Sequence, residues 1–449
     1  MRSWRRLRSW SHIRWTTLFA GALLCVGVTG ATGAAGQAWK TSAIASFDEA
    51  WKTINDTFYD PSFGGLNWAG VRDELRPRME AAATPEAARL VISEMLGRLK
   101  RSHFGLLSSD SSDALPGPAF VPVEIRISAG KAVITRVNDP AASAAGLAAG
   151  QTLVSIDGQA IADLTKGTDA LDRRAAAFEI WRRVNRALYG WDGSTSTVRV
   201  RDVSGTERTV VARRTMGDGE VTTIGNLPPL RVQFDAHEVA TPGGRHVGVI
   251  GFSVWLTTLN ERIEAAVDRF RHHDGIVIDL RGNPGGLAAM MDGIAGHFVG
   301  EPVKLGTMRT RLVPLTFTVN PRIVTTDGRR VDVYRGPLAI LVDELTGSTS
   351  ETFVGSLQGL GRARVFGRQT MGQALPALTK QLPSGDVLIY AIGDYTTSAG
   401  RSLEGEGVIP DVSISLSPKA LAAGKDEAMD AALRWVDGAG RKTIESRRN

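Results

Sequence analysis

The sequence predicts an α/β protein in which a layered core follows a helical N-terminal region and a β-rich insert. Three patterns support this division. Apolar residues recur at helical spacing in residues 41–108, short β-type runs separated by turn residues fill residues 118–215, and strands alternate with helices over residues 244–415. Residues 416–449 are expected to form a closing helix and a tail. A chain of 449 residues is too long for one compact core, so several domains are expected.

Residues 1–36 are typical of a secretory signal peptide. Five arginines precede the apolar run Leu18–Val28, and small residues follow it. We expect cleavage between Ala34 and Ala38 and an exported protein, periplasmic or secreted; a retained membrane anchor is the alternative. Losing these arginines lowers the formal net charge from +6 to +1, so the basic pI does not indicate a nucleic-acid partner. Cys25, the one cysteine, lies in the same segment, and no disulfide is expected.

Residues 41–108 are expected to be mainly helical. One face of the first helix would carry apolar side chains spaced three and four residues apart, Phe47, Trp51, Ile54 and Phe58. Asp60-Pro61 should end that helix, because proline lacks the N–H that a further turn requires. Pro85 to Leu99 is a second amphipathic stretch.

The β-rich insert contains two predicted strands, Val121–Ile127 and Ala132–Val137, followed by the run GLAAGQTLVSIDG and a hairpin that turns at Ser204-Gly205. In this order the segments resemble a PDZ domain over residues 118–215. The resemblance implies a module that binds an extended peptide by adding it to a sheet edge. A small β-rich insertion without a ligand is the alternative.

The layered core is predicted from buried strands that alternate with amphipathic helices. Residues 216–243 are expected to link the insert to it. The predicted strands are Val247–Phe252, Ile276–Leu280, Leu338–Val342 and Val387–Ile392. The predicted helices are Leu259–Arg271, Leu287–Val299, one that begins near Glu351, and a last one at Lys419–Val436.

A strand-turn-helix segment holds the first candidate for chemistry. Ser348 follows Gly347 at the start of a helix, just after the buried strand Leu338–Val342. A hydroxyl on such a turn lies beside the free N–H groups of the helix start, which favour developing negative charge. Nucleophilic serine chemistry uses this geometry. The run Ser348-Thr349-Ser350-Glu351 is also an S-x-x-E capping box, so the segment alone does not separate a nucleophile from a helix cap.

Three further segments place polar or glycine residues in predicted loops. The loop Arg281–Gly286 follows a buried strand and could supply half an oxyanion hole through its N–H groups, or serve as an anion-binding or structural turn. His103 follows Ser102 after a helix, and a lone histidine is usually structural. Glu404 and Glu406 lie in an acidic turn.

Together these segments resemble the tail-specific, or C-terminal processing, serine protease family from about residue 43 to 415. The resemblance rests on the PDZ-like insert and on four runs in order, WKTINDTFYDPSFGGLNW, IDLRGNPGG, GSTSETFVGSLQGLGRARVFG and LEGEGVIPD. It implies an α/β core related to the crotonase and Clp protease folds. It also implies peptide-bond hydrolysis with Ser348 as nucleophile and with no metal or cofactor.

One position departs from the common family pattern. Many members carry a lysine base in a TFGKG motif, whereas the matching residue here is Gln373, whose amide cannot accept the serine proton. A branch that resembles the tricorn protease core uses a histidine from a Ser-His motif and a glutamate instead. The resemblance therefore implies His103 as the base and Glu404 as the carboxylate that orients it, through Ser102, with Glu406 as the rival. The oxyanion hole would be formed by the N–H groups of Gly285 or Gly286 and of Thr349.

Two other functions stay open on the sequence. A non-catalytic ligand-binding protein on the same fold would also have lost the lysine, and the PDZ-like insert would suit a peptide-binding scaffold or chaperone. The presence of both His103 and Glu404 favours the enzyme. The expected partner is a peptide or unfolded protein, not a nucleic acid. Membrane contact is expected only through an uncleaved signal, and a homo-oligomer is left open. The enzyme hypothesis requires His103 and Ser348, which lie 245 positions apart, to converge in the fold.

Overall fold

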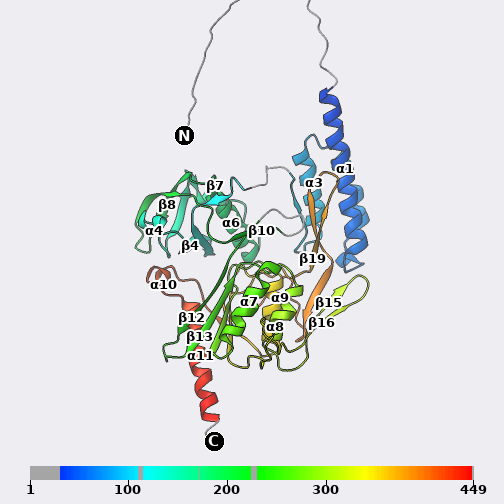
Figure 1. The fold of residues 1–449 in the computed structure, drawn as a ribbon. Coiled ribbons are helices and arrows are strands. Elements are labelled where there is room, and N and C mark those ends of the chain that lie inside the picture. The colour runs from blue at the N-terminus through cyan, green and yellow to red at the C-terminus, as the bar shows by residue number, and fades with distance from the viewer. Residues whose placement is uncertain (1–30, 110–114, 170, 224–229, 447–449) are drawn as a thin grey trace, which may run out of the picture.

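The computed structural model describes residues 31–109, 115–169, 171–223 and 230–446, so most of the predicted signal peptide lies outside the described residues. Figure 1 shows three parts: N-terminal helices, a β-rich insert, and a layered core that ends in the C-terminal helix. The predicted α/β fold is confirmed. Within the described ranges, no helix is both long and apolar enough to cross a membrane.

The N-terminal part consists of three packed helices, α1 (Ala31–Thr57), α2 (Trp68–Ala81) and α3 (Pro85–Gly97). The predicted face of Phe47, Ile54 and Phe58 is buried, and α1 ends before Asp60-Pro61 as expected. These helices share an apolar cluster with a three-stranded sheet of β1 (Gly105–Leu107), β20 (Val387–Ala391) and β19 (Ala377–Gln381). Because β1 pairs with β20, the loop after α3, which carries His103, is held against the core.

The insert is built on an antiparallel sheet in the order β3-β4-β5-β8-β9. Its strands are β3 (Val123–Ser128), β4 (Lys131–Val137), β5 (Thr152–Ile156), β8 (Thr195–Arg201) and β9 (Glu207–Arg213). The shorter elements are β2 (Ala119–Phe120), α4 (Pro140–Ala144), β6 (Gln159–Ala160), α5 (Ile161–Leu164) and β7 (Tyr189–Gly190). The helix α6 (Arg173–Leu188) contacts β3, and the predicted strands and hairpin are confirmed.

The core is a six-stranded sheet in which only the first strand is antiparallel to its neighbour. In sheet order the strands are β12 (Phe234–Ala240), β13 (His246–Phe252), β14 (Gly275–Asp279), β17 (Leu338–Val342), β18 (Arg364–Gly367) and β22 (Val412–Ser413). Alternate residues of each strand face opposite layers: Ile276, Ile278 and Ile340 pack in one apolar cluster, and Val277 and Leu341 in another. Both faces of the sheet are therefore buried.

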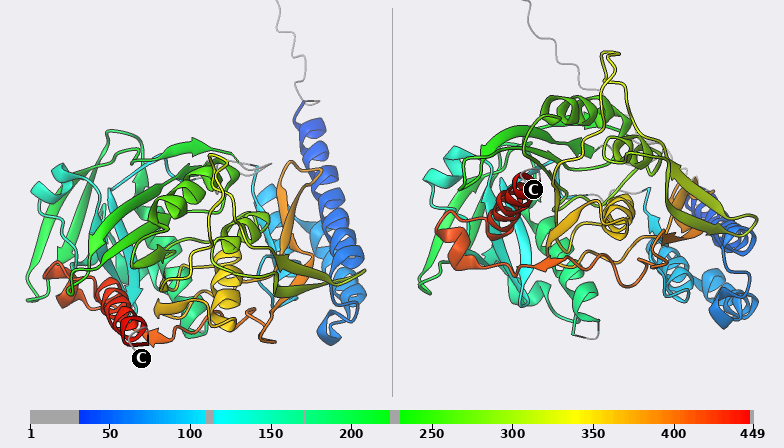
Figure 2. Two further views of the ribbon diagram at one scale, coloured as in Figure 1. Left: turned by 60° about the horizontal axis from the view of Figure 1, so that its bottom comes forward. Right: turned by 90° about the horizontal axis from the view of Figure 1, so that it is seen from below.

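Helices cover both faces of this sheet. The cluster on one face includes residues of α7 (Thr257–Phe270), α8 (Ala289–Gly296) and α9 (Thr349–Gly359), and α11 (Glu427–Ser446) packs on the other face (Figure 2). A side sheet is formed by β15 (Val303–Thr310), β16 (Leu315–Val319) and β21 (Gly393–Thr397).

Three predictions for the core were wrong. The strand predicted at Val387–Ile392 is β20, which lies in the three-stranded sheet with β1 and β19 and not in the core sheet. Residues 216–243 are not a plain linker, because they contain β10 (Glu220–Thr222), β11 (Leu230–Val232) and β12. The strand β12 lies at the sheet edge with several exposed side chains, so it lacks the apolar run that marks the inner strands. The single helix predicted at Lys419–Val436 is divided into α10 (Pro418–Ala422) and α11. Gly424 separates them with a φ of +70°, a conformation that glycine adopts without steric cost.

Candidate active site

Ser348 lies in a strained turn between the central strand β17 and the helix α9. Its φ of 51° and ψ of −120° are outside the regions that a non-glycine residue normally occupies. The Ser348 N–H donates to the carbonyl oxygen of Gln373 at 2.8 Å and to the Glu351 carboxylate at 3.1 Å. Backbone strain of this kind persists where surrounding contacts enforce it, and it concentrates at functional sites. Ser348 is also the N-cap of α9, so the cap and the candidate nucleophile are the same residue.

His103 lies in the loop between α3 and β1, with a φ of +59°. Its Nδ1 is 2.8 Å from the hydroxyl oxygen of Ser102, and that hydroxyl donates to Glu404 Oε2 at 2.8 Å. Because the hydroxyl has one proton and Glu404 accepts it, Nδ1 of His103 must be the donor to Ser102. The neutral imidazole therefore carries its proton on Nδ1, and Nε2 has the free lone pair that a general base needs.

Glu404 is fixed by backbone groups on both sides. Its Oε1 accepts the N–H of Ser102 at 2.8 Å, and its Oε2 accepts the N–H of Ala374 at 3.1 Å. The side chain of Glu406 makes no such contact with Ser102 or His103 among the described residues. The carbonyl oxygen of Glu406 accepts instead from the Gln369 side chain at 2.6 Å. The geometry thus favours Glu404 over its rival.

Ser348 and Glu404 are hydrogen-bonded to consecutive residues of one loop, Gln373 and Ala374. Ser348 is bonded to the carbonyl of Gln373, and Glu404 is bonded to the N–H of Ala374. Within the described ranges, no hydrogen bond joins His103 directly to Ser348. Catalytic hydrogen bonds are often long before substrate binds, so the common anchor carries more weight than the missing bond.

The glycine loop after β14 lies against Ser348. A Cβ on Gly285 would stand 2.6 Å from the Cβ of Ser348, and Gly285 has a φ of +105°. The N–H of Gly285 donates to the Asn283 side chain at 2.9 Å, so it is already used. Of the three oxyanion candidates, Gly286 and Thr349 are therefore better suited than Gly285.

Gly286 and Thr349 are held together by a hydrogen bond from the Thr349 hydroxyl to the Gly286 carbonyl, at 2.7 Å. The loop bonds to Trp255 through the Gly285 carbonyl and the Leu287 N–H, and neither bond uses the N–H of Gly286. The N–H of Thr349 begins α9, where no helical carbonyl is available to it. Within the described residues neither N–H is used in a backbone hydrogen bond, so both stay candidates for the oxyanion hole.

Glu351 is a residue that the sequence suggested only as part of a helix cap. Its buried carboxylate accepts from the Ser348 N–H, the Thr370 hydroxyl and the N–H groups of Gly372 and Gln373. Burial raises the pKa of Glu351 to about 7 against the effect of these bonds, which favour the charged form. The signal that could have found it is the Glu three residues after Ser348, since a capping carboxylate at this position bonds to the backbone of Ser348 itself.

We expect the catalytic rate to depend on the charge of Glu351. All of its partners donate, so protonation leaves the added O–H facing donors and should loosen the turn at Ser348. The kcat/KM of the wild type should fall as the pH falls through about 7. Glu351→Gln should lower kcat by about 10²-fold at pH 8, because small displacements of reacting groups have effects of that size. It should also flatten the pH dependence between pH 6 and 8. A Glu351→Gln profile that keeps the wild-type inflection would contradict this role.

The chain is similar to known peptidases. Residues 246–414 match the model of peptidase family S41, and residues 45–97 match that of the tricorn protease C1 domain. The chain is 26% identical to carboxyl-terminal-processing peptidase 3 (chloroplastic) of Arabidopsis thaliana, with 83% of this chain and 69% of that protein covered. It is 27% identical to the chloroplastic C-terminal processing peptidase of Tetradesmus obliquus, with 85% and 79% covered.

A solved structure has the same fold. The photosystem II D1 C-terminal processing protease superposes with a TM-score of 0.56 at 22% identity, covering 88% of this chain and 97% of that one. The helical N-terminal part, the strand-turn-helix at Ser348 and the glycine loop all lie within the matched segments. Residues 246–414 therefore form a peptidase family S41 domain, and the chain is a serine peptidase similar to the carboxyl-terminal processing proteases.

Proposed function

We propose that the protein is an exported endopeptidase that hydrolyses peptides or unfolded protein tails through an acyl-enzyme on Ser348. His103 Nε2 takes the Ser348 hydroxyl proton as the oxygen bonds to the substrate carbonyl carbon. The tetrahedral oxyanion accepts the N–H groups of Gly286 and Thr349. The C–N bond then breaks, and His103 passes its proton to the leaving amine. A water molecule then attacks the ester carbonyl carbon and gives a proton to His103. The bond between that carbon and Ser348 Oγ breaks, His103 returns the proton to Oγ, and the product carboxylic acid leaves.

The observation that carries this proposal is the common anchor at Gln373 and Ala374. The hydrogen-bonded chain His103–Ser102–Glu404 is bonded to the N–H of Ala374, and the strained Ser348 is bonded to the carbonyl of Gln373. We propose that substrate binding brings His103 Nε2 and the Ser348 hydroxyl within hydrogen-bond distance. Gln373 occupies the position of a lysine base in many relatives and cannot accept a proton, which leaves the base role to His103.

Glu404 would act through Ser102 rather than on the imidazole directly. When His103 becomes charged, the Ser102 hydroxyl relays the attraction of the Glu404 carboxylate while keeping Nδ1 protonated. This role makes Glu404 a positioning residue. Export rests on the arginine-rich and apolar sequence of residues 1–36. The β3–β9 sheet with α6 would serve as the PDZ-like module that binds substrate.

Hydrolysis of an unfolded protein by Glu404→Gln and Glu406→Gln variants tests the proposal. Glu404→Gln should lower kcat/KM by at least about 10²-fold, less than the roughly 10⁴-fold loss when a directly bonded triad carboxylate is replaced. Glu406→Gln is the matched control, since it removes a charge from the same turn, and should stay within about 3-fold of the wild type. A larger loss in Glu406→Gln would reverse the assignment, and a wild type that hydrolyses no polypeptide would contradict the proposal.

A further inference from the structure

The strand β3 has one unpaired edge. It is the terminal strand of its sheet and pairs only with β4. Ile134 of β4, which stands opposite Ile125, uses its N–H and C=O on Gln151 and Gly150 on the far side. In an antiparallel ladder this makes Ile125 and Ile134 a non-hydrogen-bonded pair. The N–H and C=O of Ile125 therefore point outward, to the free edge.

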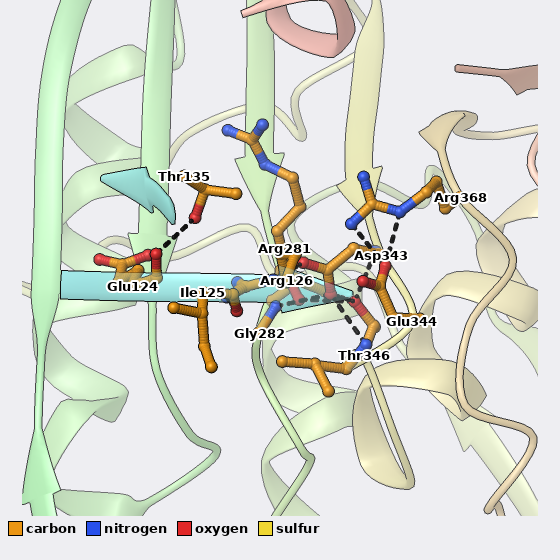
Figure 3. Close-up of polar contacts among 12 residues, drawn as sticks. Glu124, Ile125, Arg126, Thr135, Arg281, Gly282, Asp343, Glu344, Thr346 and Arg368 are labelled. Carbon is orange, nitrogen blue, oxygen red and sulfur yellow. Dashed lines mark hydrogen bonds and ion pairs between the residues drawn. The ribbon is translucent and has the colours of Figure 1, made fainter. Parts of the chain in front are cut away.

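The free edge already receives a donor. The Arg126 guanidinium gives one N–H to the Ile125 carbonyl at 2.9 Å and another to Asp343, in the turn after β17 (Figure 3). Asp343 in turn accepts the N–H of Gly282 at 2.9 Å. The outward carbonyl of Ile125 thus accepts one N–H from Arg126 and keeps a second lone pair for a donor from an added strand. Through Arg126 and Asp343 this edge is connected to the loops that lead to Ser348 and Gly286.

A cavity of about 1400 Å³ runs along this edge. Its wall combines Ile125 of β3 and Trp181 and Asn185 of α6 with Gly282 and Leu345 of the core. Pockets for compact small molecules are mostly about 300–1000 Å³, so this space suits an extended peptide better. A strand added to β3 would lie in it.

The loop that enters β3 offers no place for a chain terminus. A strand added antiparallel to β3 would end beside Phe120–Val123, where free N–H groups in succession would be needed to hold a terminal carboxylate. The N–H of Phe120 donates to Thr215 at 3.0 Å, that of Val121 to Leu188 at 3.1 Å, and that of Val123 to Val121 at 2.7 Å. Pro122 has no N–H. All of the donors of this loop are absent or used.

The cations around the cavity are largely neutralised as well. Five arginines that line it lie within 4.0 Å of a carboxylate, in the pairs Arg126–Asp343, Arg136–Glu124, Arg262–Glu220, Arg281–Asp279 and Arg368–Glu344. Among the described lining residues, Lys425 is the cation with no ion pair of this kind. A terminal carboxylate would have to compete with internal carboxylates at the other positions.

We infer that the free edge of β3 binds an internal, extended segment of the substrate and does not recognise the substrate's terminal carboxylate. The inference rests on the proposed function, because it takes the occupant of the cavity to be the polypeptide that Ser348 cleaves. It assigns the specificity of this chain to backbone pairing at Ile125 and to side-chain contacts in the cavity.

The test uses one unstructured 20-residue peptide in three forms: a free C-terminal acid, a C-terminal amide, and an amide with alternate backbone nitrogens methylated. Turnover is measured with the wild-type chain, and the dissociation constant with Ser348→Ala. Acid and amide should agree within about 3-fold in both measurements. Methylation should weaken binding by about 10-fold or more, since it removes the N–H groups that pair with a strand edge.

A preference for the acid of about 10-fold or more would overturn the inference, since charged hydrogen bonds have effects of that size. If Lys425→Met abolished that preference, the carboxylate would bind at Lys425, and the inference would be overturned in the same way. Equal binding of the methylated peptide would exclude pairing with β3. If the wild type cleaved neither acid nor amide while Ser348→Ala bound both equally, the proposed function would fail. Only the part of the inference that concerns binding without the terminal carboxylate would then stand.

Discussion

Ser348→Ala is expected to lower kcat by about 10⁴- to 10⁶-fold, with little change in the affinity for peptide. The nucleophilic oxygen is lost, and within the described residues no other hydroxyl has both the strained turn and the adjoining glycine loop. The Cβ that alanine retains keeps the contact with Gly285. Single-turnover hydrolysis of a fluorogenic peptide measures the loss, and peptide binding to the same variant shows that the fold is intact.

Ser350→Ala is the control for this assignment, since Ser350 is the second serine of the same motif. Its hydroxyl accepts the indole N–H of Trp255 at 2.8 Å in the core. The variant should lose about 1–3 kcal/mol of stability, because a buried donor is left unpaired, but should keep kcat within about 10-fold. A loss in Ser350→Ala equal to that in Ser348→Ala would mean that the wrong serine has been identified.

His103→Ala is expected to cost about 10⁴-fold or more in kcat, nearly as much as loss of the serine, because nucleophile and base act as a unit. Gln373 cannot replace the base. The matched control is Gln373→Ala, which removes the side chain at the lysine position of the relatives and leaves the backbone bonds to Ser348 and Glu351 in place. That control should keep kcat within about 10-fold. Strong inactivation of Gln373→Ala with an active His103→Ala would contradict the Ser–His assignment.

The pH dependence gives His103 a second signature. Burial lowers the pKa of His103 to about 4, so the imidazole stays neutral well below its usual range. A base must be unprotonated, so its contribution to kcat/KM is present at neutral pH and lost as the pH falls through about 4. Glu351→Gln should reveal this inflection by removing the one near 7. An inflection at about 6.5 in that variant, the ordinary value for histidine, would mean that burial does not act on His103 as described.

Several parts of the fold followed from local pattern. The apolar run Leu338–Val342 is typical of an inner strand, and the spacing of Phe47, Ile54 and Phe58 is typical of one helix face, and both are buried as predicted. The edge strand β12 and the break at Gly424 were missed for opposite reasons. An edge strand such as β12 has polar side chains at many positions, which obscures the apolar alternation that marks a strand. A glycine within a helical pattern does not by itself indicate that its φ will be positive.

The site was only partly visible in the sequence. Ser102, His103, Ser348 and Glu404 were suggested by motifs, but the preference for Glu404 over Glu406 depends on which carboxylate reaches Ser102. The use of the Gly285 N–H by Asn283, and the four donors around Glu351, are contacts that form only in the folded chain. No spacing along the chain encodes them.

By itself the sequence determined the alternation of strands and helices, the glycines that permit the loop beside Ser348, and the absence of a lysine at position 373. These are properties of single residues and their neighbours. The tertiary structure alone decided that β1 pairs with β20 and thereby carries His103 to the loop that holds Ser348. Such pairings join residues that lie hundreds of positions apart in the sequence. Their free energy comes from packing between distant segments, which local sequence patterns do not predict.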